Sequence, residues 1–115
     1  MNQLLENYTI QVDCPDVSGA EHLETLQIRD RLAELEANFS REDRDVLFAA
    51  DWKLMINIAK IYQELSRFVD LGSYRAKWKI PPQKWWWYLD VLSYLPTTLS
   101  QTTKDSIEPR DSKSA

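Results

Sequence analysis

The sequence has little glycine, cysteine or histidine, and each shortage excludes a class of protein. Two glycines cannot supply the tight turns of an all-β fold or the glycine-rich loops that bind phosphates. The single cysteine, Cys14, excludes an intrachain disulfide, so a cytoplasmic location is the default expectation. The single histidine, His22, excludes a multi-histidine metal site and shows no partner for Ser–His or Cys–His catalysis, so we interpret it as a solvated surface residue. We expect Asp51 and Asp90, if they face inward, to form ion pairs, and we predict no enzyme activity and no cofactor.

Long apolar runs are also missing. No stretch of about 18 apolar residues occurs, which predicts that the chain has no membrane span. Hydrophobic residues still make up 43% of the chain, enough to bury a core. Because 115 residues leave little room for a second core, we predict one domain at residues 1–95. Residues 96–115 are rich in serine and threonine and are expected to be a flexible, disordered tail.

The net charge is −4, but the two signs are unevenly placed along the chain. Residues 1–51 carry 12 acidic and 4 basic groups, a net of −8, whereas residues 52–95 carry 7 basic and 3 acidic groups, a net of +4. The overall acidity disfavours nucleic acid as a partner. The asymmetry allows a homodimer, in which the acidic first helix of one copy faces the basic segment of another.

Three helices are predicted. The first spans residues 19–38 and begins with the capping-box spacing of Ser18 and Glu21. The second spans residues 41–71 without proline or glycine and carries apolar residues on two adjacent stripes. A helix this broadly apolar must be covered on more than one side, so we expect it to be the centre of the fold. The third helix is expected over residues 82–95.

Two segments alternate large apolar with polar residues, which is the period of a half-buried strand. They span residues 7–13 and 73–80. An isolated strand is unstable, so the two segments can pair as a two-stranded β-ribbon packed on the helices. An extended arm docked across the second helix would preserve the same alternation, and both alternatives stay open. The predicted fold class is therefore mainly α, with three helices around a long central helix and either a small β-ribbon or an extended arm.

Four large aromatic residues, Trp85, Trp86, Trp87 and Tyr88, are consecutive in the sequence. No single face of a helix or strand holds four adjacent side chains of this size. On the predicted third helix, Trp85 and Trp87 turn toward the core, whereas Trp86 shares the polar side with Asp90. We therefore expect Trp86 to be exposed.

A basic segment precedes these rings and completes a candidate protein-binding surface within residues 74–88. Its predicted site residues are Arg75, Lys77, Trp78, Lys79, Lys84 and Trp86. Tryptophan, tyrosine and arginine are enriched at binding hot spots, which favours an adaptor or assembly factor that binds another protein or a peptide. The same mixture suits single-stranded nucleic acid, so a small nucleic-acid-binding regulator is the alternative, and it also suits an anionic membrane surface. In a third interpretation the rings only fill the core and the cations are solvated.

The segment from Lys79 to Asp90, KIPPQKWWWYLD, resembles segments of small uncharacterised cyanobacterial proteins. The likeness covers only these residues and carries no named family or activity. It implies an accessory or assembly role in a photosynthetic or carbon-fixing cell. It assigns no functional residue.

Overall fold

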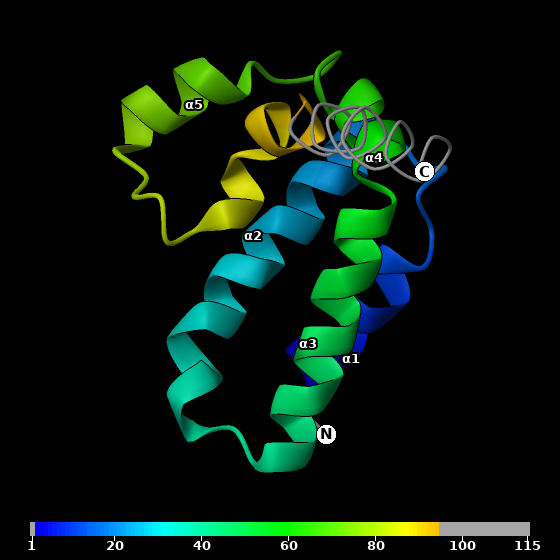
Figure 1. The fold of residues 1–115 in the computed structure, drawn as a ribbon, viewed down its shortest axis with the longest axis vertical. Coiled ribbons are helices and arrows are strands. Elements are labelled where there is room, and N and C mark those ends of the chain that lie inside the picture. The colour runs from blue at the N-terminus through cyan, green and yellow to red at the C-terminus, as the bar shows by residue number, and fades with distance from the viewer. Residues whose placement is uncertain (1, 95–115) are drawn as a thin grey trace, which may run out of the picture.

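The computed structural model describes residues 2–94, and the regular elements in this range are all helical (Figure 1). They are α1 (Gln3–Val12), α2 (Gly19–Leu35), η1 (Glu36–Asn38), α3 (Arg41–Ile56), α4 (Ile58–Leu65), α5 (Leu71–Trp78) and η2 (Trp85–Trp87), where η marks a 3₁₀ turn. A last helical segment covers residues 89–94, where the description ends. The mainly α prediction is confirmed. The predicted tail and its boundary at residue 95 lie outside the described residues.

The helix α1 joins the two longest helices, because it packs against both α2 and α3 (Figure 1). α2 and α3 run in opposite directions and are linked by η1 at one end of the molecule. α4 packs against α2 at the other end, and the chain continues from there to α5. Gly19 permits this close approach, since a Cβ atom on it would lie only 2.5 Å from the carbonyl oxygen of Glu64. From α5 the chain returns through η2, which also packs against α2.

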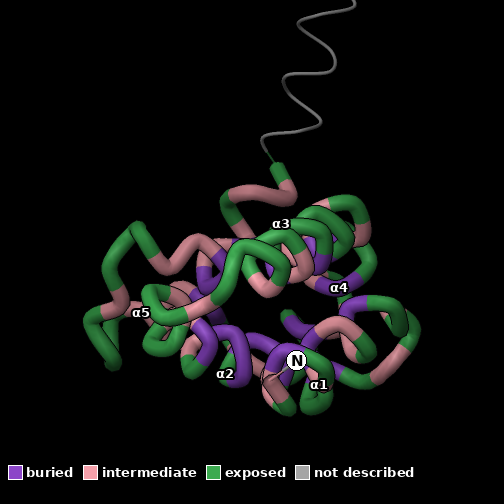
Figure 2. The backbone as a smooth tube through the Cα atoms, turned by 90° about the horizontal axis from the view of Figure 1, so that it is seen from below, coloured by how far each residue is buried: buried purple, intermediate pink, exposed green. Residues whose placement is uncertain are grey.

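The core lies where α1, α2, α3 and α4 face one another, as the buried segments of the tube show (Figure 2). Side chains just before α2 and α3 cap the first turns of these helices. The Ser18 side chain accepts a hydrogen bond from the Glu21 backbone N–H and the Glu21 side chain reaches back, which confirms the capping box. Ser40 accepts from the Asp43 N–H at 3.1 Å and starts α3. The fully buried side chains of the core include Leu5, Tyr8, Val12, Leu26, Leu32, Leu54, Ile61 and Leu65.

The prediction of a strand at residues 7–13 is wrong, because these residues belong to α1 and its C-terminal cap. The helix begins upstream of the alternating run, where the Asn2 side chain accepts a hydrogen bond from the Leu4 N–H at 2.7 Å. Leu5, Tyr8 and Val12 are then spaced by three and four residues and form one buried face. The alternation over residues 8–13 was too short to outweigh this helical period.

The prediction of a strand at residues 73–80 is also wrong, since α5 occupies Leu71–Trp78. The Asp70 side chain caps this helix by accepting from the Ser73 N–H at 3.1 Å. The helix ends at Lys79, which adopts a left-handed conformation with a φ of 52°. Because residues 7–13 are helical, the segment has no strand to pair with, and neither the ribbon nor the extended arm forms.

The predicted 41–71 helix is divided in two. Asn57 separates α3 from α4, and both its backbone N–H and its side-chain amide donate to the carbonyl oxygen of Lys53. A side chain that competes for helical acceptors in this way favours a helix boundary. The predicted third helix is wrong over its first half, because residues 85–87 form the 3₁₀ turn η2 and the α-helical segment starts only at Leu89.

Candidate protein-binding surface

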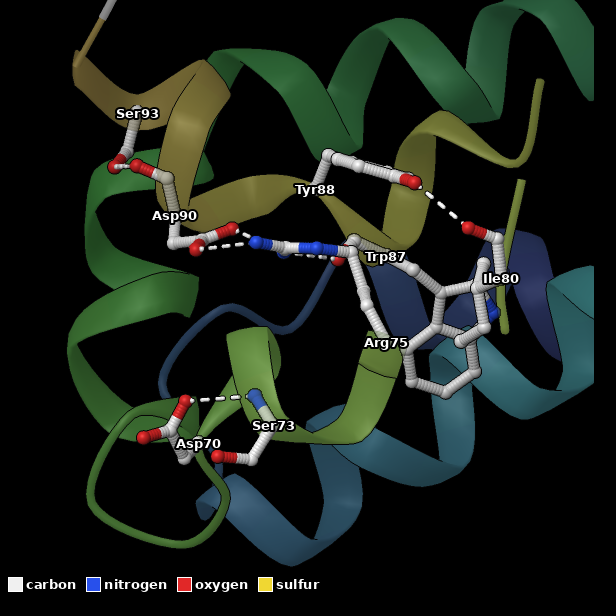
Figure 3. Close-up of polar contacts among 8 residues, drawn as sticks. All are labelled: Asp70, Ser73, Arg75, Ile80, Trp87, Tyr88, Asp90 and Ser93. Atoms are coloured by element: carbon white, nitrogen blue, oxygen red, sulfur yellow. Dashed lines mark hydrogen bonds and ion pairs between the residues drawn. The ribbon is translucent and has the colours of Figure 1, made fainter. Parts of the chain in front are cut away.

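Arg75, the first predicted site residue, is a structural clamp rather than an open contact (Figure 3). Its guanidinium donates to both carboxylate oxygens of Asp90, at 2.6 and 3.0 Å. It also donates to the carbonyl oxygen of Trp87 at 3.0 Å and lies over the Tyr88 ring, 4.5 Å from its centre. Arg75 thereby fastens α5 to the chain beyond η2. The ion pair predicted for Asp90 is confirmed.

The Arg75–Asp90 pair shifts the pKa values of both groups. The hydrogen bond to Asp90 is the main cause that raises the pKa of Arg75. Burial of Asp90 disfavours its charged form, but the hydrogen bonds and positive charge of Arg75 outweigh that effect and lower the pKa of Asp90. Both groups are therefore charged at neutral pH and bound to each other.

Trp86 is buried, with only 3% of its surface exposed, so the expectation that it faces solvent is wrong. Its indole Nε1–H and that of Trp87 both donate to Oδ1 of Asp30, each at 2.8 Å. The guanidinium of Arg29 lies over the Trp86 ring, 4.3 Å from its centre. Adjacent residues point about 120° apart on a 3₁₀ turn, so the two rings both face inward because they share an acceptor on α2.

Three of the predicted site residues do point outward. Trp78 is 59% exposed at the end of α5, and the Lys77 ammonium lies 5.4 Å from the centre of its ring. Lys79 follows and is also exposed. Lys84 is partly exposed, with its ammonium 3.9 Å from Asp30. The structure therefore leaves one exposed aromatic ring, Trp78, among the six predicted residues.

A larger exposed aromatic surface lies on α3, where the sequence analysis placed no site. Phe48, Trp52 and Ile56 are 72%, 60% and 65% exposed. They follow one another at intervals of four residues, so they form one stripe along the helix, which we call the α3 stripe. In Figure 2, α3 presents an exposed side to solvent. The signal in the sequence was the second apolar stripe of the predicted 41–71 helix, which a chain of this size had too few residues to cover.

A groove of about 330 Å³ lies beside the α3 stripe. Residues of α3 form one wall, and side chains beyond α5 form the other. Its lining is almost wholly apolar except for one carboxylate, that of Asp51. The lining residues are Phe48, Asp51, Trp52, Met55, Trp85 and Leu92. The stripe and the groove together offer a ridge and a hollow to a partner.

A buried polar cluster holds Asp51 in place at the groove. Arg29 donates to both its carboxylate oxygens, at 2.9 and 3.0 Å, and the Tyr8 hydroxyl donates to Oδ1 at 2.6 Å. Burial, with the nearby Asp51 charge, raises the pKa of Tyr8 and keeps its hydroxyl protonated. The predicted ion pair of Asp51 is confirmed. Its carboxylate links α3 to Tyr8 of α1 and to Arg29 of α2.

The single histidine lies outside the α3 stripe and outside the lining of the groove. His22 is buried rather than solvated, with Nε2 lying 3.2 Å from the carbonyl oxygen of Pro15, and burial lowers its pKa. Within residues 2–94, no cluster of three or more His, Cys, Asp or Glu side chains is placed to hold a metal ion. None of the described helices is long and apolar enough to cross a membrane. Comparisons with protein-family models, with curated proteins and with solved structures gave no match.

Proposed function

We propose that this chain is a non-enzymatic protein-binding module, an adaptor or assembly factor, whose main contact surface is the α3 stripe. One observation carries the proposal. Three large apolar side chains, each more than half exposed, lie on one helix face beside an apolar groove. Contiguous exposed apolar surface of this kind is typical of interaction sites. The proposal moves the contact surface from residues 74–88 to α3, because Arg75 and Trp86 are held inside the molecule.

The spacing of the α3 stripe suits a helical partner. Apolar residues at intervals of four match the exposed face of an amphipathic helix, which binds by laying its own apolar side chains along the stripe and into the groove. Phe48 and Trp52 would be the anchors, since large aromatic side chains contribute most at hot spots. The Asp51 carboxylate already has three hydrogen bonds, from Arg29 and Tyr8, so it places no unpaired charge in the groove.

The nucleic-acid alternative rests on the three outward residues at the end of α5, Lys77, Trp78 and Lys79. Binding of single strands needs several rings on which successive bases stack. The segment exposes one ring, and the net charge of −4 opposes a polyanion. A gel-shift titration against salt tests this alternative. Affinity that falls steeply with salt and is lost in Trp78→Arg would favour it over protein binding.

The resemblance of residues 79–90 to segments of small cyanobacterial proteins supports a setting for this role. We place the module in the cytoplasm of a photosynthetic or carbon-fixing cell, where it would act as an accessory or assembly factor. The resembling segment contains Trp86 and Trp87, which anchor the chain to α2 through Asp30. On this view the segment maintains the fold, and α3 makes the contact.

Affinity capture with two matched variants tests the proposal. The full chain, Trp52→Arg and Trp78→Arg are immobilised and exposed to an extract of the source cells. The two tryptophans are equally exposed, at 60% and 59%, so the variants change comparable surface at different places. We expect proteins recovered by the unmodified chain and by Trp78→Arg to be lost from Trp52→Arg. Identical recovery by both variants would overturn the proposal.

A further inference from the structure

We infer that a second copy of this chain occupies the α3 stripe, in an antiparallel pairing of the two α3 helices across a two-fold axis near Trp52. This inference rests on the proposed function, because it names one partner for the same stripe. In a two-fold contact the same patch of both copies meets, so the patch must be complementary to itself. The residues around Trp52 meet that requirement.

The α3 stripe is nearly symmetric about Trp52. Phe48 and Ile56 lie four residues to either side of it, and Ala49 and Met55 lie three residues to either side. An antiparallel pairing reverses these positions, so Phe48 of one copy lies level with Met55 of the second on one side of the axis. Ala49 lies level with Ile56 of the second copy on the other side. The two Trp52 rings meet at the axis, and on either side of it a large residue faces a smaller or more flexible one, which allows the helices to interdigitate.

Charge along α3 favours the antiparallel direction. Residues 41–45 contain three acids and two arginines, a net of −1. The Arg44 guanidinium is already turned toward the carbonyl oxygens of Ala37 and Phe39. Between residue 46 and its end at Ile56, α3 carries Asp51 and Lys53, a net charge of zero, and Asp51 is already paired with Arg29. Antiparallel pairing turns the acidic start of each α3 helix toward the half of the other that carries Lys53, whereas parallel pairing would bring the two acidic starts together.

The charge term is small, and it sets direction more than affinity. Lys53 and Lys60 each form an exposed ion pair within their own copy, with Asp13 and Asp16 respectively. Exposed pairs of this kind exchange partners at little cost. The helix dipoles act in the same sense, since antiparallel helices place opposite ends side by side.

The size of the stripe predicts a weak dimer. Phe48, Trp52 and Ile56 are 60–72% exposed and offer roughly 400 Å² per copy, because a large side chain carries about 150–250 Å². A stable interface usually buries about 800 Å² on each partner. Leu92, which lines the groove, extends the surface at its edge. We therefore expect dissociation in the micromolar range or weaker, with monomer in dilute solution.

Sedimentation equilibrium of the full chain tests this inference. The apparent mass of the unmodified chain should rise from 13.5 kDa toward twice that value as concentration increases from micromolar to near millimolar. Trp52→Arg should stay at the monomer mass, and Trp78→Arg should behave like the unmodified chain. A constant monomer mass of the unmodified chain, or an equal rise in Trp52→Arg, would overturn the inference. A constant monomer mass leaves the proposed function standing if capture from extract still depends on Trp52.

Disulfide cross-linking tests the direction of pairing. In a Cys14→Ser background, the Ala49→Cys and Ile56→Cys variants are oxidised separately and as a mixture. Antiparallel pairing places these two positions level with each other, whereas the two copies of position 49 lie about 9 Å apart along the helix axis at 1.5 Å per residue. We expect the mixed disulfide to form fastest. Faster linkage of Ala49→Cys to itself would contradict the antiparallel arrangement.

Discussion

Trp86 and Trp52 sit on the same small chain, yet one is buried and the other is 60% exposed. Trp86 comes from a segment that looks like an exposed aromatic run, but its N–H meets the carboxylate of Asp30, 56 residues earlier in the sequence. Trp52 lies within the helix that the sequence predicts to be the centre of the fold. The other described residues nevertheless leave most of its ring exposed. A tryptophan of this chain is thus buried where a distant segment supplies both apolar cover and an acceptor for its N–H.

The largest loss of stability is expected for a substitution of Asp51, whose carboxylate binds buried side chains of α1 and α2. Asp51→Ala removes both hydrogen bonds of the buried Arg29 guanidinium and the acceptor of the Tyr8 hydroxyl, and it leaves Arg29 with the partly exposed Glu36 carboxylate at 3.8 Å. The free energy of unfolding should fall by about 3–5 kcal/mol, the usual result of leaving a buried charge unpaired. Urea unfolding followed by circular dichroism measures this.

A second variant distinguishes the unpaired charge from a simple loss of packing. Arg29→Met in the Asp51→Ala background removes the charge and should recover part of the lost stability. Arg29 Nη1 has no hydrogen-bond partner within the described residues, so the arginine is already incompletely compensated. A double variant as unstable as the sum of the single variants would contradict this explanation.

A smaller loss is expected at Asp30, which holds both buried indoles. Asp30→Ala leaves the N–H groups of Trp86 and Trp87 without an acceptor, and it should cost about 2–4 kcal/mol in unfolding free energy. Asp30→Asn retains a carbonyl oxygen and should cost less. Lys84→Ala is the matched control, because its 3.9 Å contact with Asp30 is partly exposed and contributes little. Equal losses in Asp30→Ala and Lys84→Ala would show that the shared acceptor is unimportant.

The buried His22 makes a smaller contribution to folding stability, and this contribution depends on pH. Burial lowers its pKa below the ordinary value of about 6.5, so the unfolded chain binds a proton that the folded chain does not. Stability should therefore decrease as the pH falls below about 6.5, by no more than about 1.4 kcal/mol per pH unit. His22→Gln should flatten this part of the profile. An unchanged slope in thermal unfolding between pH 7 and pH 5 would assign the dependence to other groups.

The smallest effects on stability are expected for substitutions of the two exposed tryptophans, Trp52 and Trp78. Trp52→Arg and Trp78→Arg should each change the unfolding free energy by less than about 0.5 kcal/mol in dilute solution, because both rings are more than half exposed. Urea unfolding of both variants at low concentration is the measurement. A loss well above 1 kcal/mol in Trp52→Arg alone would mean that the α3 stripe belongs to the core rather than to a contact surface.

Features that depend on neighbouring residues could be predicted from the sequence. Ser18 and Ser40 start α2 and α3 as expected, because a capping side chain and its N–H lie within three residues. The absence of a long apolar helix among the described residues also follows from local composition. Asp51 and Asp90 form the expected ion pairs, since a carboxylate turned inward needs a cation.

The candidate site could not be predicted, because it depends on which surfaces other segments cover. The period-2 pattern at Arg75, Lys77 and Lys79 fits both a strand and a short exposed helix, and the choice depends on whether residues 7–13 offer a strand. Trp86 is buried only because Asp30 lies opposite η2. The α3 stripe is exposed because the other described segments cover Met55 and Trp85 in part but leave Trp52 60% exposed. Each of these facts involves residues far apart in the sequence.

Hydroxyl-radical footprinting of Trp52 and Trp78 in one sample shows whether α3 is the contact surface. The two rings are equally exposed in the isolated chain, so they should oxidise at similar rates in dilute solution. In the chain isolated together with the proteins it binds, or at high concentration, we expect Trp52 to be protected while Trp78 oxidises as before. Equal oxidation of both rings under all conditions, or protection of Trp78 alone, would contradict the assignment of α3 as the contact surface.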